Sequence, residues 1–149
     1  MRIALTPLTM LVAAAVSLLP GCGKPEPADL TGTAWQLTDI ESMAPDEQPS
    51  TTIDDPAKYT VTFEPAGRAA FQVDCNRGNS SWQAAASGPD SGSLSFGPIA
   101  LTKMACPQPS ADAAVTAALG RVRGYLISEG KLHLSLEADS GIMHWRPVS

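Results

Sequence analysis

The chain has 149 residues, of which 17% are charged, and a formal net charge of −5 at neutral pH. This length accommodates one ordinary domain rather than two, and the near-average composition argues against disorder of the whole chain. The sequence contains no run of lysines and arginines. It therefore lacks the basic face that the phosphate backbone requires, and nucleic acid is excluded as a partner.

The N-terminal segment has the pattern of a bacterial lipoprotein signal peptide, which we place at residues 1–21. Arg2 precedes an apolar stretch at residues 3–19, and the stretch ends in Leu19-Pro20-Gly21-Cys22. A small residue before the cysteine suits a peptidase, and the Cys22 thiol can form a thioether to diacylglycerol. We expect Cys22 to be the lipidated N-terminus of the mature chain and to carry acyl chains such as palmitate. An ordinary secretory signal with an incidental cysteine is the alternative.

Residues 22–29 are predicted to be the lipidated N-terminus and a flexible tether, because Pro25 and Pro27 favour extended backbone. Position 23 is glycine rather than the aspartate that usually retains a lipoprotein in the inner membrane. In a Gram-negative cell the expected location is therefore the cell envelope, at the outer membrane facing the periplasm. Membrane lipid is then a partner through acylated Cys22, and residues 30–149 form the domain.

Within this domain, alternation of apolar and polar side chains and short apolar runs predict strands. About eight such segments occur, at residues 33–40, 59–63, 68–73, 79–85, 93–96, 125–128, 131–137 and 142–146. Residues 64–67 have proline second and glycine fourth, which favours a type I turn and joins two of the strands into a hairpin. Residues 41–56 contain three prolines and residues 87–92 read SGPDSG, so both are predicted surface loops.

One segment, Ser110–Arg123, predicts an amphipathic helix. Ser110 is a good N-cap, Asp112 lies in the first turn and Gly124 follows the last turn. Apolar residues recur at helical spacing and include Leu119, which we expect in the core. Short connections make neighbouring strands antiparallel. The predicted fold class is mainly β (α+β): a curved antiparallel sheet or partial β-barrel of about eight strands with one helix packed on it.

Three segments together resemble the META domain, also called the HslJ-like domain. They are Thr33-Ala34-Trp35-Gln36-Leu37, Asp74-Cys75-Asn76-Arg77-Gly78 after a strand, and Leu101-Thr102-Lys103-Met104-Ala105-Cys106-Pro107 before the helix. Leu132-His133-Leu134 and residues 141–145 are similar to the C-terminal hairpin of that family, so the resemblance covers about Leu30–Arg146. It implies the fold, an envelope location and a part in envelope stress tolerance. It assigns no molecular role to Asn76, Thr102 or Met104. The start of the helix, residues 111–114, is less acidic and less bulky than the family pattern.

Cys75 and Cys106 remain as a pair once Cys22 is lipidated. A structural disulfide, a metal pair and a reactive thiol are the three interpretations, and secretion favours the disulfide. Neighbouring strands could bring His133 and His144 together, but no two candidate ligands have a short metal-binding spacing. We therefore predict no metal and no other cofactor, and we expect both histidines to face solvent.

The remaining candidates have structural interpretations. Asn76 and Arg77 predict an Asx-type turn, in which asparagine tolerates a left-handed conformation; a ligand-recognition loop is the alternative. Met104 is predicted to fill the core. The Asp54-Asp55 pair lies in a proline-rich loop that would position it poorly for catalysis. Three tryptophans are expected to pack in the core rather than to line a ligand pocket: Trp35, Trp82 and Trp145.

No catalytic residue is predicted, because neither histidine lies in a recognisable nucleophile context and no glycine-rich phosphate loop occurs. The sequence favours a non-enzymatic envelope lipoprotein, a binding or stress-related module whose partner is an unidentified envelope protein or small ligand. The alternative is a periplasmic redox or metal-binding protein that uses Cys75 and Cys106. The state of these two thiols separates the two hypotheses.

Overall fold

The structure is a computed structural model that describes residues 29–149. The predicted signal peptide, Cys22 and most of the predicted tether at residues 22–29 lie outside the described residues, so they stay predictions. No helix within residues 29–149 combines the length and the hydropathy needed to cross a bilayer.

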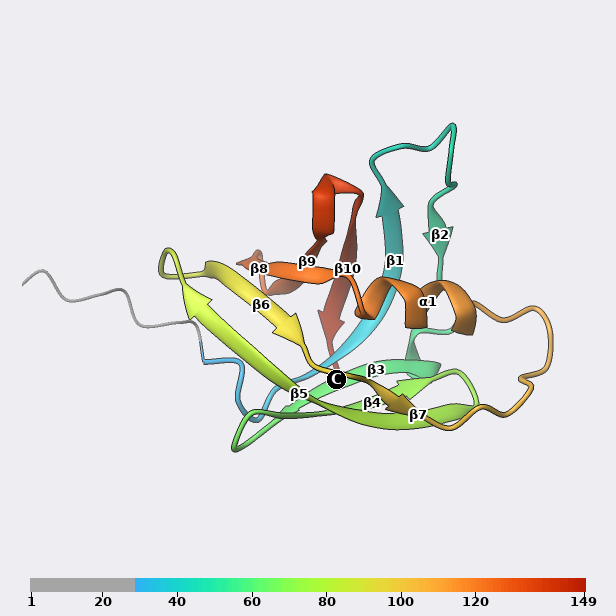
Figure 1. Ribbon diagram of the computed structural model, residues 1–149, viewed down its shortest axis with the longest axis horizontal. Coiled ribbons are helices and arrows are strands. Elements are labelled where there is room, and N and C mark those ends of the chain that lie inside the picture. Colours follow the sequence, from blue (N-terminus) through green and yellow to red (C-terminus); the bar gives the residue numbers. More distant parts are fainter. Residues whose placement is uncertain (1–28) are drawn as a thin grey trace, which may run out of the picture.

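Eight antiparallel strands form a closed barrel (Figure 1). Their order is β10-β9-β8-β6-β5-β4-β3-β1, and β1 pairs with β10 to close the sheet. The strands are β1 (Ala34–Ser42), β3 (Tyr59–Glu64), β4 (Arg68–Val73), β5 (Asn76–Ala86), β6 (Ser91–Phe96), β8 (Val122–Ser128), β9 (Lys131–Leu136) and β10 (Gly141–Pro147). The mainly-β fold with one helix is confirmed, and the barrel is closed rather than partial.

Two further strands have only two residues each. β2 (Thr51–Thr52) pairs with β1, and β7 (Ala100–Leu101) pairs with β5. A 3-10 turn, η1 (Pro56–Lys58), begins at the last residue of the loop predicted at residues 41–56, and a second, η2 (Glu137–Asp139), joins β9 to β10. Such short elements contain too few residues to show a periodic pattern.

The helix α1 spans Asp112–Leu119 and is shorter than the predicted Ser110–Arg123. The predicted end is wrong, because β8 begins at Val122, where the chain pairs with Leu136 of β9. Gly124, expected to follow the helix, lies inside β8. The predicted N-cap is also wrong by one residue: the N-cap is Ala111, which makes no side-chain cap, although the Ser110 hydroxyl accepts a hydrogen bond from the Asp112 amide at 3.2 Å. The segment that begins at Val122 therefore forms a strand paired with β9, although its local sequence pattern is also compatible with a helix.

The helix covers one end of the barrel (Figure 1). β3 begins and β4 ends at this end, and the Tyr59 hydroxyl accepts a hydrogen bond from the Ala111 amide at 3.0 Å. Val115, Ala118 and Leu119 point into the barrel and are buried. Leu119 is only 1% exposed, so its predicted place in the core is confirmed.

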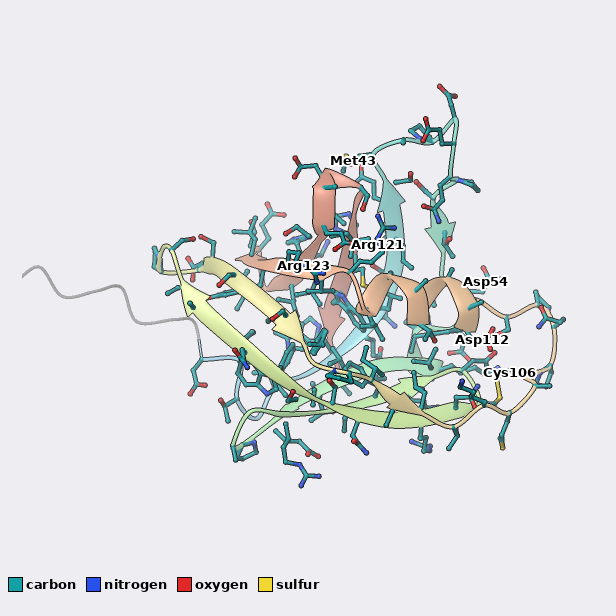
Figure 2. The ribbon with its side chains drawn as sticks, viewed as in Figure 1. Met43, Asp54, Cys106, Asp112, Arg121 and Arg123 are labelled. Carbon is teal, nitrogen blue, oxygen red and sulfur yellow. A yellow bond between two sulfur atoms is a disulfide. The ribbon has the colours of Figure 1, made fainter. Side chains whose placement is uncertain are left out.

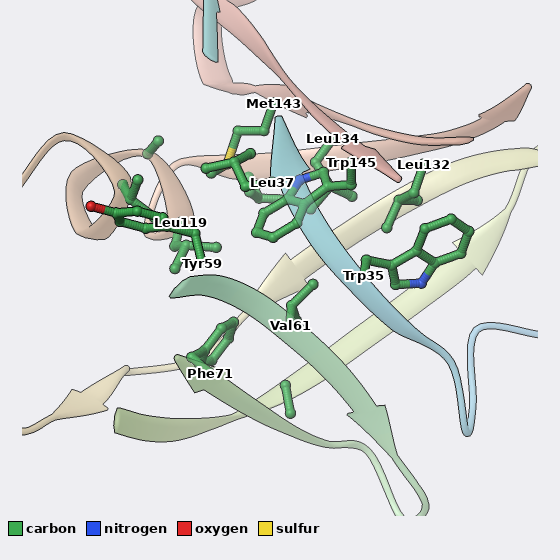
Figure 3. Packing of buried hydrophobic residues seen from close by; sticks show 14 of the residues in the cluster. Trp35, Leu37, Tyr59, Val61, Phe71, Leu119, Leu132, Leu134, Met143 and Trp145 are labelled. Carbon is green, nitrogen blue, oxygen red and sulfur yellow. The ribbon is translucent and has the colours of Figure 1, made fainter. Parts of the chain in front are cut away.

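Side chains from all around the barrel meet in one hydrophobic cluster (Figure 3). Trp35 and Trp145 are 7% and 1% exposed, and the half-buried Trp82 packs edge to face against Phe63 with ring centroids 5.1 Å apart. The tryptophans therefore pack in or against the core, as predicted. Near the other end of the barrel, Leu30 is 1% exposed, so the core begins at the first residues of the domain.

Candidate functional site

The two halves of the predicted motif meet at the start of β5. The turn between β4 and β5 carries Cys75, and the segment before α1 carries Cys106, 31 positions later. A disulfide joins them, with Cα atoms 5.5 Å apart. We call the cluster formed by Cys75, Asn76, Thr102, Met104 and Cys106 the Asn76 clamp.

Asn76 lies at the centre of this clamp and is 5% exposed. Its Oδ1 accepts hydrogen bonds from the Met104 amide at 2.8 Å and from the Thr102 hydroxyl at 2.9 Å. Its Nδ2 donates to the Met104 carbonyl at 3.2 Å. An amide group carries both an acceptor and a donor, so asparagine can satisfy both backbone groups of Met104 at once. An aspartate here would place an acceptor against the Met104 carbonyl.

Backbone contacts complete the clamp. The Arg77 amide donates to the Thr102 hydroxyl at 3.1 Å, and the Thr102 amide donates to the Arg77 carbonyl at 3.0 Å. Gly78 then faces β7, where an added Cβ would collide with the carbonyl oxygen of Ala100. The glycine of the Cys-Asn-Arg-Gly segment is therefore required by the close approach of β7 to β5.

Two predictions about this motif are wrong. Asn76 is the first residue of β5 and is not left-handed; the left-handed residue in the turn is Asp74, with φ of 53°. Met104 does not fill the core, because it is 58% exposed. Its backbone is bound by Asn76 while its side chain faces solvent. The sequence around Met104 has no alternating or helical pattern, so it does not indicate whether this side chain faces the core or solvent.

A groove of about 530 Å³ lies between this segment and α1. Its lining is mixed, with alanines on the helix side and both a cation and an anion: Asn76, Leu101, Thr102, Lys103, Met104, Ala105, Asp112, Ala113, Thr116 and Ala117. The small side chains of the helix leave this space open. Figure 2 shows Cys106 and Asp112 on this side of the molecule and Met43 far from them.

A second polar cluster lies on the outside of the barrel, where His133 of β9 pairs with His144 of β10. Their Nδ1 atoms are 2.7 Å apart and share a hydrogen bond, in which one ring is the N–H donor and the other the acceptor. His144 Nε2 lies 3.0 Å from Glu41 Oε2 and 3.9 Å from Asp39 Oδ1. The pKa of His133 is lowered, first by burial and then by the neighbouring His144 and Lys131. Both histidines are half-buried rather than freely exposed.

Among residues 29–149, no group of three or more histidine, cysteine, aspartate and glutamate side chains is arranged to hold a metal ion. Asp54 and Asp55 are exposed, and Asp55 lies 4.0 Å from the Lys58 ammonium. Such an exposed pair contributes little to stability.

The structure is a closed antiparallel barrel with a helix over one end. A disulfide joins its Cys-Asn turn to the Thr-Lys-Met-Ala-Cys segment before the helix. These features define the class of small barrel domains to which the protein belongs. The sequence matches the family model of the META domain over residues 28–147, and the chain belongs to this family. No curated protein matches the sequence.

Two solved structures share the fold. One is the NMR structure of a protein from Burkholderia xenovorans, with 19% identity and a TM-score of 0.63, covering 89% of this chain and 97% of that one. The other is the crystal structure of a DUF4847 family protein from Bacteroides vulgatus, with 15% identity and a TM-score of 0.54, covering 77% of this chain and 92% of that one. At these identities the likeness concerns the fold alone.

Proposed function

We propose that this chain is a lipid-anchored envelope lipoprotein whose META domain is a non-enzymatic binding module. The N-terminal sequence supports the anchor through its apolar stretch and Leu-Pro-Gly-Cys ending at Cys22. The domain then acts at the membrane surface facing the periplasm, in keeping with a role in envelope stress. The binding surface is the groove between α1 and residues 101–105.

The observation that supports this proposal most directly is that Met104 is exposed to solvent while hydrogen bonds hold its backbone in place. Met104 is 58% exposed, although its amide donates a hydrogen bond to Asn76 and its carbonyl accepts one from Asn76. A partner that binds here does not have to order this segment, so less conformational entropy is lost on binding. Methionine is also a flexible, polarisable side chain that adapts to apolar partners.

The partner that fits this surface is an apolar segment of another envelope protein. Leu101, Met104 and the alanines of α1 offer apolar contacts, while Lys103 and Asp112 offer one charge of each sign beside them. An apolar centre with polar groups around it is the usual anatomy of a protein interface.

The test places a photo-crosslinking amino acid at Met104 in cells that express the full chain. Met43 is the matched control, because it is also exposed, at 47%, but lies in the connection between β1 and β2. We expect a discrete crosslinked protein from position 104 and not from position 43. Identical products from both positions, or none from either, would contradict the proposal.

A second pair of variants tests whether the groove itself is used. Ala113→Trp fills the groove, whereas Ala114→Trp adds the same side chain to an exposed position of α1 that does not line it. We expect the first variant to abolish the crosslink from position 104 and the second to leave it. Loss of the crosslink in both variants would show that the helix surface is only generally perturbed.

A further inference from the structure

The two sulfur atoms of the disulfide lie in different environments. Cys106 is 7% exposed, whereas Cys75 is half-buried in the turn before β5. Two N–H groups point at Cys106 Sγ: the backbone amide of Cys75 at 3.3 Å and the side-chain amide of Asn76 at 3.4 Å. Both sulfur atoms lie 3.9 Å from the Met104 carbonyl oxygen, so this contact does not distinguish them.

These two N–H groups bear on the chemistry of the sulfur. A disulfide sulfur is a weak hydrogen-bond acceptor, but a thiolate is an anion, and hydrogen bonds to anions are stronger than hydrogen bonds to neutral groups. Both contacts therefore strengthen if the bond opens with the negative charge on Cys106. In thiol–disulfide exchange the better leaving group departs faster, and access decides which sulfur is attacked. Both factors favour attack at Cys75.

We propose that Cys75 is a modification site at which small thiols add to the folded protein. A thiolate attacks Cys75 Sγ and forms a new disulfide with it. The Cys75–Cys106 bond breaks, and its electron pair stays on Cys106 Sγ as a thiolate held by the two N–H groups. Attack of this thiolate on Cys75 Sγ reverses the step and expels the small thiol. A second small thiolate can instead attack the added sulfur, which releases a small disulfide and leaves both protein thiols reduced.

The fold tolerates this opening because Asn76 holds the same segment independently of the disulfide. Its bonds to Thr102 and Met104 involve no sulfur atom. The segment before α1 therefore stays attached to β5 when the bond opens. A group added at Cys75 lies beside Met104, so the modification changes the surface next to the groove.

The first experiment determines which sulfur is attacked. The unreduced full chain is incubated with glutathione, free thiols are blocked with N-ethylmaleimide, and the peptides are mapped by mass spectrometry. We expect glutathione on Cys75 and the maleimide on Cys106. Glutathione on Cys106, or reaction only after unfolding in urea, would overturn the proposal.

The second experiment tests the amide donor. Asn76→Asp replaces the Nδ2 donor by a carboxylate oxygen, while Asn79→Asp adds the same charge at an exposed position of β5. We expect exchange at Cys75 to slow roughly tenfold in the first variant, since a hydrogen bond to a charged group is lost, and to stay within about twofold in the second.

Thr102→Val separates donor loss from loosening of the clamp. It removes the hydroxyl that bonds Asn76 Oδ1 but keeps the Nδ2 donor. We expect no slowing in this variant. Unchanged or faster exchange in Asn76→Asp, or equal slowing in Thr102→Val, would show that the Asn76 donor does not stabilise the departing thiolate.

Discussion

Removal of the Asn76 side chain tests whether the Asn76 clamp stabilises the domain. Asn76→Ala deletes four hydrogen bonds: two with the backbone of Met104, one from the hydroxyl of Thr102 and a weak one to the Sγ atom of Cys106. A typical hydrogen bond contributes about 0.5–1.5 kcal/mol net. Because Met104 is exposed, water replaces part of what its backbone loses. We therefore expect the free energy of unfolding to fall by about 2–3 kcal/mol, a substantial part of the roughly 5–15 kcal/mol of a typical domain.

Urea denaturation of the mature domain, followed by circular dichroism, measures this loss. The matched control is Asn79→Ala, which removes the same side chain from an exposed position of β5. It should change the free energy of unfolding by less than about 0.5 kcal/mol. If Asn76→Ala also costs less than about 0.5 kcal/mol, the clamp does not stabilise the domain and the reasoning is refuted.

Three further predictions use the same assay. Leu119→Ala should cost about 2–5 kcal/mol because Leu119 is 1% exposed, whereas Leu126→Ala, at a position 45% exposed, should cost less than about 0.5 kcal/mol. Reduction of the disulfide, Cys75→Ser and Cys106→Ser should each cost about 3–4 kcal/mol for a loop of 31 residues, and a double mutant much worse than either single would contradict one shared bond. Since folding lowers the pKa of His133, the unfolded chain takes up the proton first. The contribution of neutral His133 to stability is then complete above about pH 6.5 and is lost as the pH falls through its lower folded pKa, so His133→Gln should flatten the profile below about pH 6.5.

The strands of the barrel were largely predictable from the sequence, because each buries one face. In β3 and β9, apolar residues alternate with polar ones, and the structure places the apolar set inside. The same rule predicted that His133 and His144 lie away from the core on neighbouring strands. The end of α1 was not predictable in this way, because Val122 suits both the apolar stripe of a helix and the first inward position of β8.

The geometry of the candidate site was harder to predict from the sequence. The cysteine pair predicted that the two motif segments meet, and the disulfide joins them. The role of Asn76 depends on Met104, a residue far along the chain, whereas propensity describes only local backbone preferences. Asn76 holds the backbone of Met104 in a position where the side chain faces solvent. The prediction that Met104 fills the core used only its apolar character and was therefore wrong.

Metabolic labelling with a tagged fatty acid tests the central claim, that the domain is held at a membrane by an acylated N-terminus. Cells expressing the full chain are compared with cells expressing Cys22→Ala, and the membrane and soluble fractions are examined for label and protein. Several acyl chains anchor a protein stably, whereas a single chain binds reversibly. We expect the natural chain to be labelled and recovered with membranes, and the variant to be neither. Undiminished labelling of Cys22→Ala, or membrane recovery that does not depend on Cys22, would contradict the account.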